Sequence, residues 1–194
     1  MSYSIESITA DCYPGSAVLI NLLDIRDADR LAEAENMATA VRAAEWLNKP
    51  LCNSYDFGHY KRIHAYLFGD LYSWAGQVRT VDIAKKTTRF CHVDEIQRCA
   101  DAIFSKIQHL KLCELSRERF VDEILDLYVT TNILHPFREG NGRTQRVFLT
   151  QLVRESGHDI RFDLADPDEL MIATIRSAEG VNDILRALLD DIIN

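Results

Sequence analysis

The spacing of apolar residues along the chain predicts a protein built almost entirely of helices. Long stretches carry apolar side chains three and four positions apart, as on the buried side of an amphipathic helix, and contain little Pro or Gly. We expect helices at residues 26–47, 56–74, 94–112, 118–134, 141–156, 168–176 and 181–193. The predicted fold class is therefore all-α, a helical bundle.

One segment departs from the helical pattern. Between Gly76 and Val93, apolar and polar residues alternate, as in a strand with one buried side. Around a polar tip, Lys85-Lys86-Thr87-Thr88, the alternating apolar residues are Val78, Val81, Ile83 and Phe90. We expect a small β-hairpin here, although no Asn-Gly or Asp-Gly pair marks its turn.

Composition and charge narrow the classes of partner. The 194 residues suffice for one domain with a substantial core, and their formal net charge is −8. This acidic balance argues against broad electrostatic binding, so we expect no direct nucleic-acid partner and no membrane association. The N-terminus lacks a signal-peptide pattern and none of the five cysteines forms a C-x-x-C pair, which predicts a cytoplasmic protein with reduced thiols.

The stretch "HPFREGNGRTQR", residues 135–146, concentrates the candidate chemistry. It follows residues 127–134, which carry no charge and are expected to form a helix at the centre of the bundle. Pro136 disfavours helical geometry at the residue before it, so the helix should end near Leu134 and leave His135 in a loop. A histidine held in this way can serve as a general base.

The same stretch is suited to bind phosphate groups. Gly140 and Gly142 flank Asn141 at the start of the next expected helix, where backbone amides can converge on an anion. Arg143 and Arg146 lie three residues apart on one side of that helix and can bind further phosphate oxygens. Several anionic groups in a row are implied, as in a di- or triphosphate.

Glu139 would repel a bare phosphate, which suggests a bridging Mg²⁺ ion. Each feature alone has a structural alternative: His-Pro often ends a helix, Asn-Gly often forms a turn, and an arginine pair often lies on a solvated helix face. Together they indicate a phosphate-centred transfer reaction. Arg138, in contrast, has no assigned role and is expected at the surface.

The stretch matches the Fic-domain signature, HPFx[D/E]GNGRxxR, at every defined position, and the chain resembles this family. The resemblance extends through "LYSWAGQVRTVDI" and "SAEGVNDILRALL", and "YPG" at residues 13–15 resembles the start of bacterial Fic toxins related to cell-filamentation proteins. It predicts a Fic-fold helical bundle with a hairpin flap at residues 22–194, after an N-terminal arm at residues 1–21.

The resemblance implies a protein adenylyltransferase that transfers AMP from ATP-Mg²⁺ to a hydroxyl side chain of a target protein. His135 would be the base and Glu139 the Mg²⁺ ligand. The phosphates would be bound by Gly140, Asn141, Gly142, Arg143 and Arg146. Gly-Asn-Gly at residues 140–142 resembles the AMP-transferring majority of the family, whereas its kinase-like branch has lysine at the second glycine.

The family also implies protein partners. Its flap pairs with an extended segment of the target, and the flap residues assigned to target positioning are Val81, Ile83, Lys85, Lys86, Arg89 and Phe90. The alternative for the charged ones is that they keep an exposed hairpin tip soluble. In the toxin branch, targets include the ATPase subunits of DNA gyrase and topoisomerase IV, and a small antitoxin supplies an inhibitory helix.

Glu35 is the candidate inhibitory residue within the chain itself. The family's restraining motif, [S/T]-x-x-x-E-[G/N], places its glutamate against the second motif arginine, here Arg146. Residues 31–36, "LAEAEN", contain Glu35 and Asn36 but have Leu31 in place of Ser or Thr. The simpler interpretation is an exposed helix glutamate paired with a neighbour, with inhibition left to a separate antitoxin.

Two other functions remain open at this stage. One is a regulatory module that binds a nucleotide and a partner without catalysis, and the other is transfer of the γ-phosphoryl group. An intact His135 argues against the first, because a module that only binds needs no base at that position.

Overall fold

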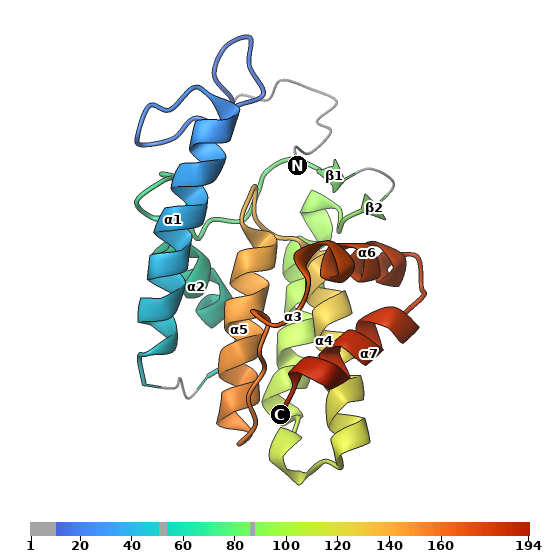
Figure 1. Cartoon of the computed structure of the whole chain (residues 1–194). Helices are drawn as coiled ribbons and strands as arrows, with labels where there is room; N and C mark the ends of the chain where they lie inside the picture. The colour runs from blue at the N-terminus through green and yellow to red at the C-terminus, as the bar shows by residue number, and fades with distance from the viewer. Residues whose placement is uncertain (1–10, 51–53, 86–87) are drawn as a thin grey trace.

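The computed structural model describes residues 11–50, 54–85 and 88–194. In this part of the chain it contains seven α-helices and one two-stranded sheet (Figure 1). The helices are α1 (Ala28–Leu47), α2 (Phe57–Phe68), α3 (Ile96–His109), α4 (Arg117–Leu134), α5 (Asn141–Glu155), α6 (Pro167–Ala178) and α7 (Asp183–Ile192), with short 3₁₀ turns at Val93–Glu95 and Leu112–Glu114. The predicted all-α bundle is confirmed.

Short polar side chains set several helix starts. Asp27 accepts a hydrogen bond from the backbone N–H of Arg30 at the start of α1, and Asp56 accepts one from His59 at the start of α2. The prediction for α2 was too long, because the helix ends at Phe68 and the chain turns at Gly69. Residues up to Trp74 instead form turns beside the bundle.

Helices α4 and α5 form the centre of the bundle. Helix α5 packs against α1, α2 and α4, while α4 also packs against α3, α6 and α7 (Figure 1). No side chain between residues 127 and 134 is exposed, as predicted for a central helix. The loop that joins these two helices is therefore supported by the centre of the core. In the part of the chain that the structure describes, no helix has the length and apolar content needed to cross a bilayer.

The predicted hairpin is much shorter than its sequence pattern. Strands β1 (Ala84–Lys85) and β2 (Thr88–Arg89) pair antiparallel, Ala84 with Arg89 and Lys85 with Thr88. The residues on either side are irregular, because they bond to other parts of the molecule: the N–H of Cys91 donates to the carbonyl of Ile133 at 2.9 Å. The hairpin is thus tied to the end of α4.

Part of the predicted N-terminal arm packs on the bundle. Cys12 and Leu19 form an isolated β-bridge and belong to the buried core. The N–H of Leu22 donates to the carbonyl of Leu71 at 2.8 Å. Residues 11–21 are therefore anchored, while the division into an arm and a Fic domain stays a prediction, and residues 1–10 lie outside the described part.

Candidate active site

His135 lies where α4 ends and the motif loop begins. Helix α4 ends at Leu134, as Pro136 predicts, and His135 follows with φ 41° and ψ 58°, in the left-handed region. This conformation is uncommon for a residue other than glycine and persists where the surroundings hold it. The residue as a whole is only 6% exposed, so both the backbone and the ring of His135 have a fixed place.

Two contacts orient the His135 ring. Its Nδ1 lies 3.0 Å from the carbonyl oxygen of Asn132, which can only accept, so Nδ1 carries the hydrogen. In the neutral ring Nε2 then has the lone pair that a general base needs. Phe90 of the hairpin stacks on the ring, with 3.6 Å between the centroids and 16° between the planes.

Gly140 and Asn141, at the start of α5, make contacts within the motif loop, and their phosphate-binding roles stay predictions. The Gly140 N–H donates to Oε1 of Glu139 at 2.7 Å. The buried Asn141 side chain accepts from the N–H of Phe137 at 2.9 Å and donates to its carbonyl at 2.8 Å. The Asn141 side chain therefore braces the loop. This leaves the first-turn backbone amides, that of Gly142 among them, as the groups suited to an anion.

A cavity of about 310 Å³ opens beside the motif. His135, Gly142 and Arg146 line it together. The rest of its wall is largely apolar and consists of Thr88, Phe90, Tyr128, Asn132, Gln145, Phe162, Ala165, Pro167, Leu170, Met171, Thr174 and Ile175. A small ligand with one anionic end and one flat apolar end suits such a cavity.

Arg146 supplies the positive charge at this cavity. Its guanidinium lies beside Gly142, where an added Cβ would be 3.4 Å from Nη1. Burial lowers the pKa of Arg146, and the charge of Arg143 adds to this effect. Among the described residues, no carboxylate forms an ion pair with Arg146. A desolvated cation of this kind attracts an anion strongly.

Arg143 has a different environment from Arg146 and does not line the cavity. Its Nη2 lies 2.5 Å from Oε2 of Glu35, on α1, and its Cζ lies 4.8 Å from the centre of the Phe68 ring. Glu35 also accepts a hydrogen bond from the hydroxyl of Tyr72. Glu35 is only 8% exposed, so its interpretation as an exposed helix glutamate was wrong. Its partner is the first motif arginine, and its inhibitory role stays a prediction.

Glu139 is the carboxylate predicted to bind Mg²⁺. Its side chain is 21% exposed and its Oε1 lies 3.5 Å from Nη2 of Arg143. Among the described residues, no group of three or more His, Cys, Asp or Glu side chains could hold a metal by itself. One carboxylate at a phosphate site is nevertheless typical of Mg²⁺, which takes its other ligands from phosphate and water.

His64 supports the motif loop from behind. The N–H of Gly76 donates to its Nδ1 at 2.8 Å, so the Nε2 hydrogen is directed to the carbonyl of Glu139, 2.9 Å away. The ring stacks on Phe137, with 3.8 Å between the centroids. Burial lowers the pKa of His64 to about 4, so this support is neutral near pH 7. These contacts give His64 a structural role.

Arg79 is a site residue that sequence reasoning missed. Its buried guanidinium donates to the carbonyl oxygens of His135 at 2.9 Å, Val81 at 2.7 Å, and Cys91. Its backbone N–H donates to the carbonyl of Pro136 at 2.9 Å. One side chain thus joins both legs of the hairpin to the motif loop. The only signal in the sequence was an arginine inside a segment expected to bury one side.

We expect Arg79→Lys to lower AMP transfer about 100-fold, because small displacements of reacting groups cost rates of this order. The single ammonium group of lysine cannot replace the planar guanidinium that donates to three carbonyl groups. His135 and the hairpin would then no longer be held by the same side chain. Binding of a nucleotide analogue should change far less, since Arg79 does not line the cavity. Initial rates and calorimetric titration measure both quantities. Arg119→Lys, at an exposed position of α4, is the control; equal effects of the two changes would refute this role.

The remaining flap residues occupy mixed positions. Val81 and Ile83 are half-buried, and Arg89 is exposed. Phe90 contacts the His135 ring, whereas the backbone of Lys85 is in β1. Lys86 lies outside the described residues. The structure brings Phe90 to the site, and the target-positioning role of the group stays a prediction.

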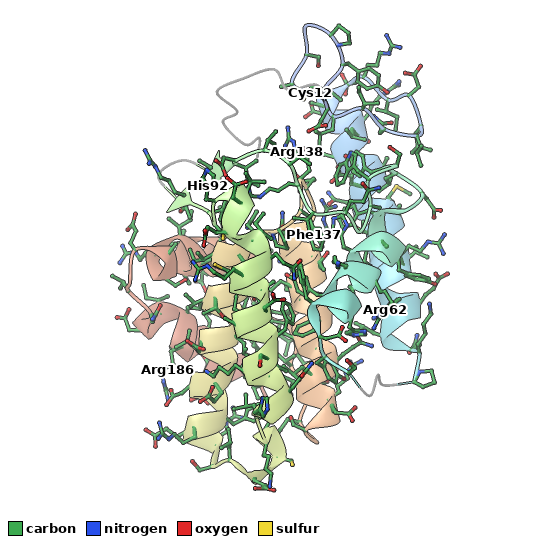
Figure 2. The ribbon with its side chains drawn as sticks, turned by 180° about the vertical axis from the view of Figure 1, so that it is seen from behind. Cys12, Arg62, His92, Phe137, Arg138 and Arg186 are labelled. Atoms are coloured by element: carbon green, nitrogen blue, oxygen red, sulfur yellow. The ribbon has the colours of Figure 1, made fainter. Side chains whose placement is uncertain are left out.

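Arg138 is not a surface residue as expected. It is only 4% exposed, and its Nε lies 3.5 Å from Oδ2 of Asp11. Its Nη2 lies 3.9 Å from Sγ of Cys12 (Figure 2). Arg138 therefore joins the back of the motif loop to the N-terminal segment. A contact between residues this far apart in the chain could not be read from the motif.

Comparisons with known proteins identify the family to which the chain belongs. The Fic/DOC family model matches residues 54–153. Protein adenylyltransferase VbhT of Bartonella schoenbuchensis is 38% identical over 179 residues, which cover 91% of this chain and 37% of that protein. The chain therefore spans little more than a third of VbhT. "Probable protein adenylyltransferase y4lH" of Sinorhizobium fredii is 39% identical over 172 residues, covering 87% of this chain and 88% of that protein.

A solved structure has the same fold. The N-terminal Fic domain of a VirB-translocated effector protein from Bartonella quintana, with bound ADP, superposes with a TM-score of 0.89 at 27% identity, over 95% of this chain and 94% of that one. The family model includes the whole motif, from His135 to Arg146. On these matches, and with its motif loop between the two central helices, the chain belongs to the Fic/DOC family.

Proposed function

We propose that this protein is an adenylyltransferase that transfers AMP from ATP to a hydroxyl side chain of a target protein. The observation that carries the proposal is the arrangement of His135. The hydrogen bond from its Nδ1 to the carbonyl of Asn132 presents Nε2 as a base. His135 lines one cavity with Gly142 and with Arg146, a cation that forms no ion pair with any described carboxylate. The names of the related adenylyltransferases and the ADP bound to a similar Fic domain support it.

The reaction requires one proton acceptor and several fixed positive groups. The target hydroxyl attacks the α-phosphorus of ATP, Nε2 of His135 takes its proton, and pyrophosphate leaves. The products are the target bearing a phosphodiester-linked AMP and pyrophosphate. Because phosphoryl-type transition states are loose, positioning and charge neutralisation contribute more than the strength of the base.

Several residues of the motif would each bind a different part of the triphosphate. The first-turn amides of α5 and Arg146 bind phosphate oxygens, and Arg146 stabilises the charge that develops on pyrophosphate. Glu139 would hold Mg²⁺, which neutralises phosphate charge when it is bound. The apolar wall of the cavity, which includes Leu170 and Ile175, is suited to the adenine base. Arg143, whose Nη2 lies 3.5 Å from Oε1 of Glu139, would contact the phosphates beside that carboxylate.

We propose that the flap, including Phe90, pairs with an extended target segment, and that the protein acts in the cytoplasm. It is the toxin of a toxin–antitoxin pair, with a small antitoxin as its inhibitor and ATPase subunits of type II topoisomerases as targets. The resemblance to bacterial Fic toxins supports these points, and purified gyrase and topoisomerase IV subunits are the direct test.

Labelled ATP distinguishes the proposed reaction from its alternatives. The full chain is incubated with a bacterial lysate and ATP labelled at either the α- or the γ-phosphate. We expect label from the α-phosphate alone to appear on a protein band, because AMP retains that phosphate. Label from the γ-phosphate alone would indicate kinase-like chemistry. Absence of both labels, with ATP binding intact, would favour a module that binds without catalysis.

A further inference from the structure

The buried pair between Glu35 and Arg143 lies next to the carboxylate that would bind Mg²⁺. One nitrogen, Nη2 of Arg143, is 2.5 Å from Oε2 of Glu35 and 3.5 Å from Oε1 of Glu139. The guanidinium therefore stands between two carboxylates and is held closer to the one on α1. The side chains of Glu35, Arg143 and Glu139 are 11%, 23% and 21% exposed, so solvent screens these charges only in part.

The surroundings of Glu35 favour this arrangement. The Tyr72 hydroxyl donates to Oε1 of Glu35, and burial raises the pKa of Tyr72, which keeps this donor protonated. Thr39, one turn along α1, lies 3.4 Å from Nη1 of Arg143. The two oxygens of Glu35 are thus engaged by Tyr72 and Arg143. A fixed carboxylate with a fixed donor behind it is a rigid anchor for a cation.

We propose that Glu35 is a positioning residue that holds the Arg143 guanidinium toward α1, limits its ion pair with Glu139, and so leaves the Glu139 carboxylate able to bind Mg²⁺. Without the negative charge at Glu35, the nearest carboxylate for Arg143 is Glu139. The guanidinium and the metal ion then compete for the same oxygens. Glu35 acts through Arg143 and supports the reaction, which is the opposite of an inhibitory role. The inference rests on the proposed function in taking ATP-Mg²⁺ as the ligand.

The test is the Mg²⁺ dependence of Glu35→Gln, which keeps the shape of the side chain and removes its charge. Binding of the ATP analogue AMPPNP by the full chain is measured by calorimetry over a series of Mg²⁺ concentrations. We expect the Mg²⁺ concentration for half-maximal binding to rise about 10- to 100-fold, the usual cost of losing a group that orients a metal ligand. High Mg²⁺ should restore binding. Glu33→Gln, an exposed position on the same helix, should leave the curve unchanged.

A second pair of variants tests whether the effect passes through Arg143. In an Arg143→Met background the competing cation is absent, so adding Glu35→Gln should not shift the Mg²⁺ curve further. Circular dichroism and thermal unfolding show whether each variant is folded. A shift of equal size in both backgrounds would overturn the proposed route.

The outcomes separate this inference from the proposed function. An unchanged Mg²⁺ curve for Glu35→Gln, or increased AMP transfer at every Mg²⁺ concentration, would overturn the inference, and the second result would establish an inhibitory Glu35. A shifted binding curve in a protein that transfers no AMP would overturn the proposed function alone. If the wild-type chain showed no Mg²⁺-dependent binding of AMPPNP, the proposed function and the positioning role of Glu35 would both be refuted.

Discussion

Replacing His135 by alanine should reduce AMP transfer by about 1,000-fold or more, within the range expected for loss of a general base and of its orientation. The Nε2 lone pair is fixed by the Nδ1 bond to Asn132, and alanine offers no acceptor there. Nucleotide binding should persist, because Arg146 and the start of α5 remain. Transfer of α-labelled AMP to a target and calorimetric binding of AMPPNP measure the two effects.

The control for this prediction is His109→Ala. His109 is exposed in the last turn of α3, so its loss tests the general effect of removing an imidazole. It should leave both measurements at the wild-type level. AMP transfer by His135→Ala at more than a few per cent of the wild-type rate would remove the base from the mechanism.

Gly140→Ala should inactivate the protein through the shape of the motif loop. Gly140 has φ 80°, and a Cβ at this position would lie 2.2 Å from Cζ of Phe68. Phe68 is fully buried, so its ring has little room to move. The left-handed backbone and the clash together should lower the free energy of unfolding by about 2–5 kcal/mol. AMP transfer should fall to background, because Phe68 also supports the guanidinium of Arg143.

A matched change separates backbone strain from the clash. Gly157 has φ 87°, but nothing lies within 4 Å of a Cβ at that position. Gly157→Ala should therefore cost only about 1–2 kcal/mol and leave transfer intact. Adding Phe68→Leu to Gly140→Ala removes the clashing ring carbons and should restore part of the activity. No recovery in a folded double variant would argue that the clash is not the cause.

The helices were predictable because their signals are local. Apolar periodicity located all seven, and the step from Leu134 through Pro136 to the motif loop followed from proline stereochemistry. The end of α2 was missed because the apolar pattern continues beyond Gly69 into turns that pack on the bundle. The hairpin was predicted too long because its alternating residues bond to α4 and to Arg79.

The motif predicted which residues are candidates for the site, but it did not predict how their side chains are arranged. The motif predicted roles for His135, Glu139 and Arg146, but it did not predict that Arg143 and Arg146 have different surroundings. That distinction depends on how α1 packs against α5, which brings Glu35 to a residue 108 positions later. A contact between two residues so far apart in the chain produces no pattern that can be recognised in a single sequence. The same is true of the contact between Arg138 and Asp11.

The stacking of Phe90 on His135 has a consequence for the choice of target residue. Phe90 of the flap fixes the orientation of the His135 ring, and in the proposed function the flap also aligns the target strand. One short segment therefore positions both the base and the target hydroxyl. Alternate side chains of a strand point to opposite sides, and a slip of one position would turn the hydroxyl away from His135. Modification should therefore depend on the register of a target segment along the flap, with several hydroxyl residues accepted at one position and the same residues refused at its neighbours.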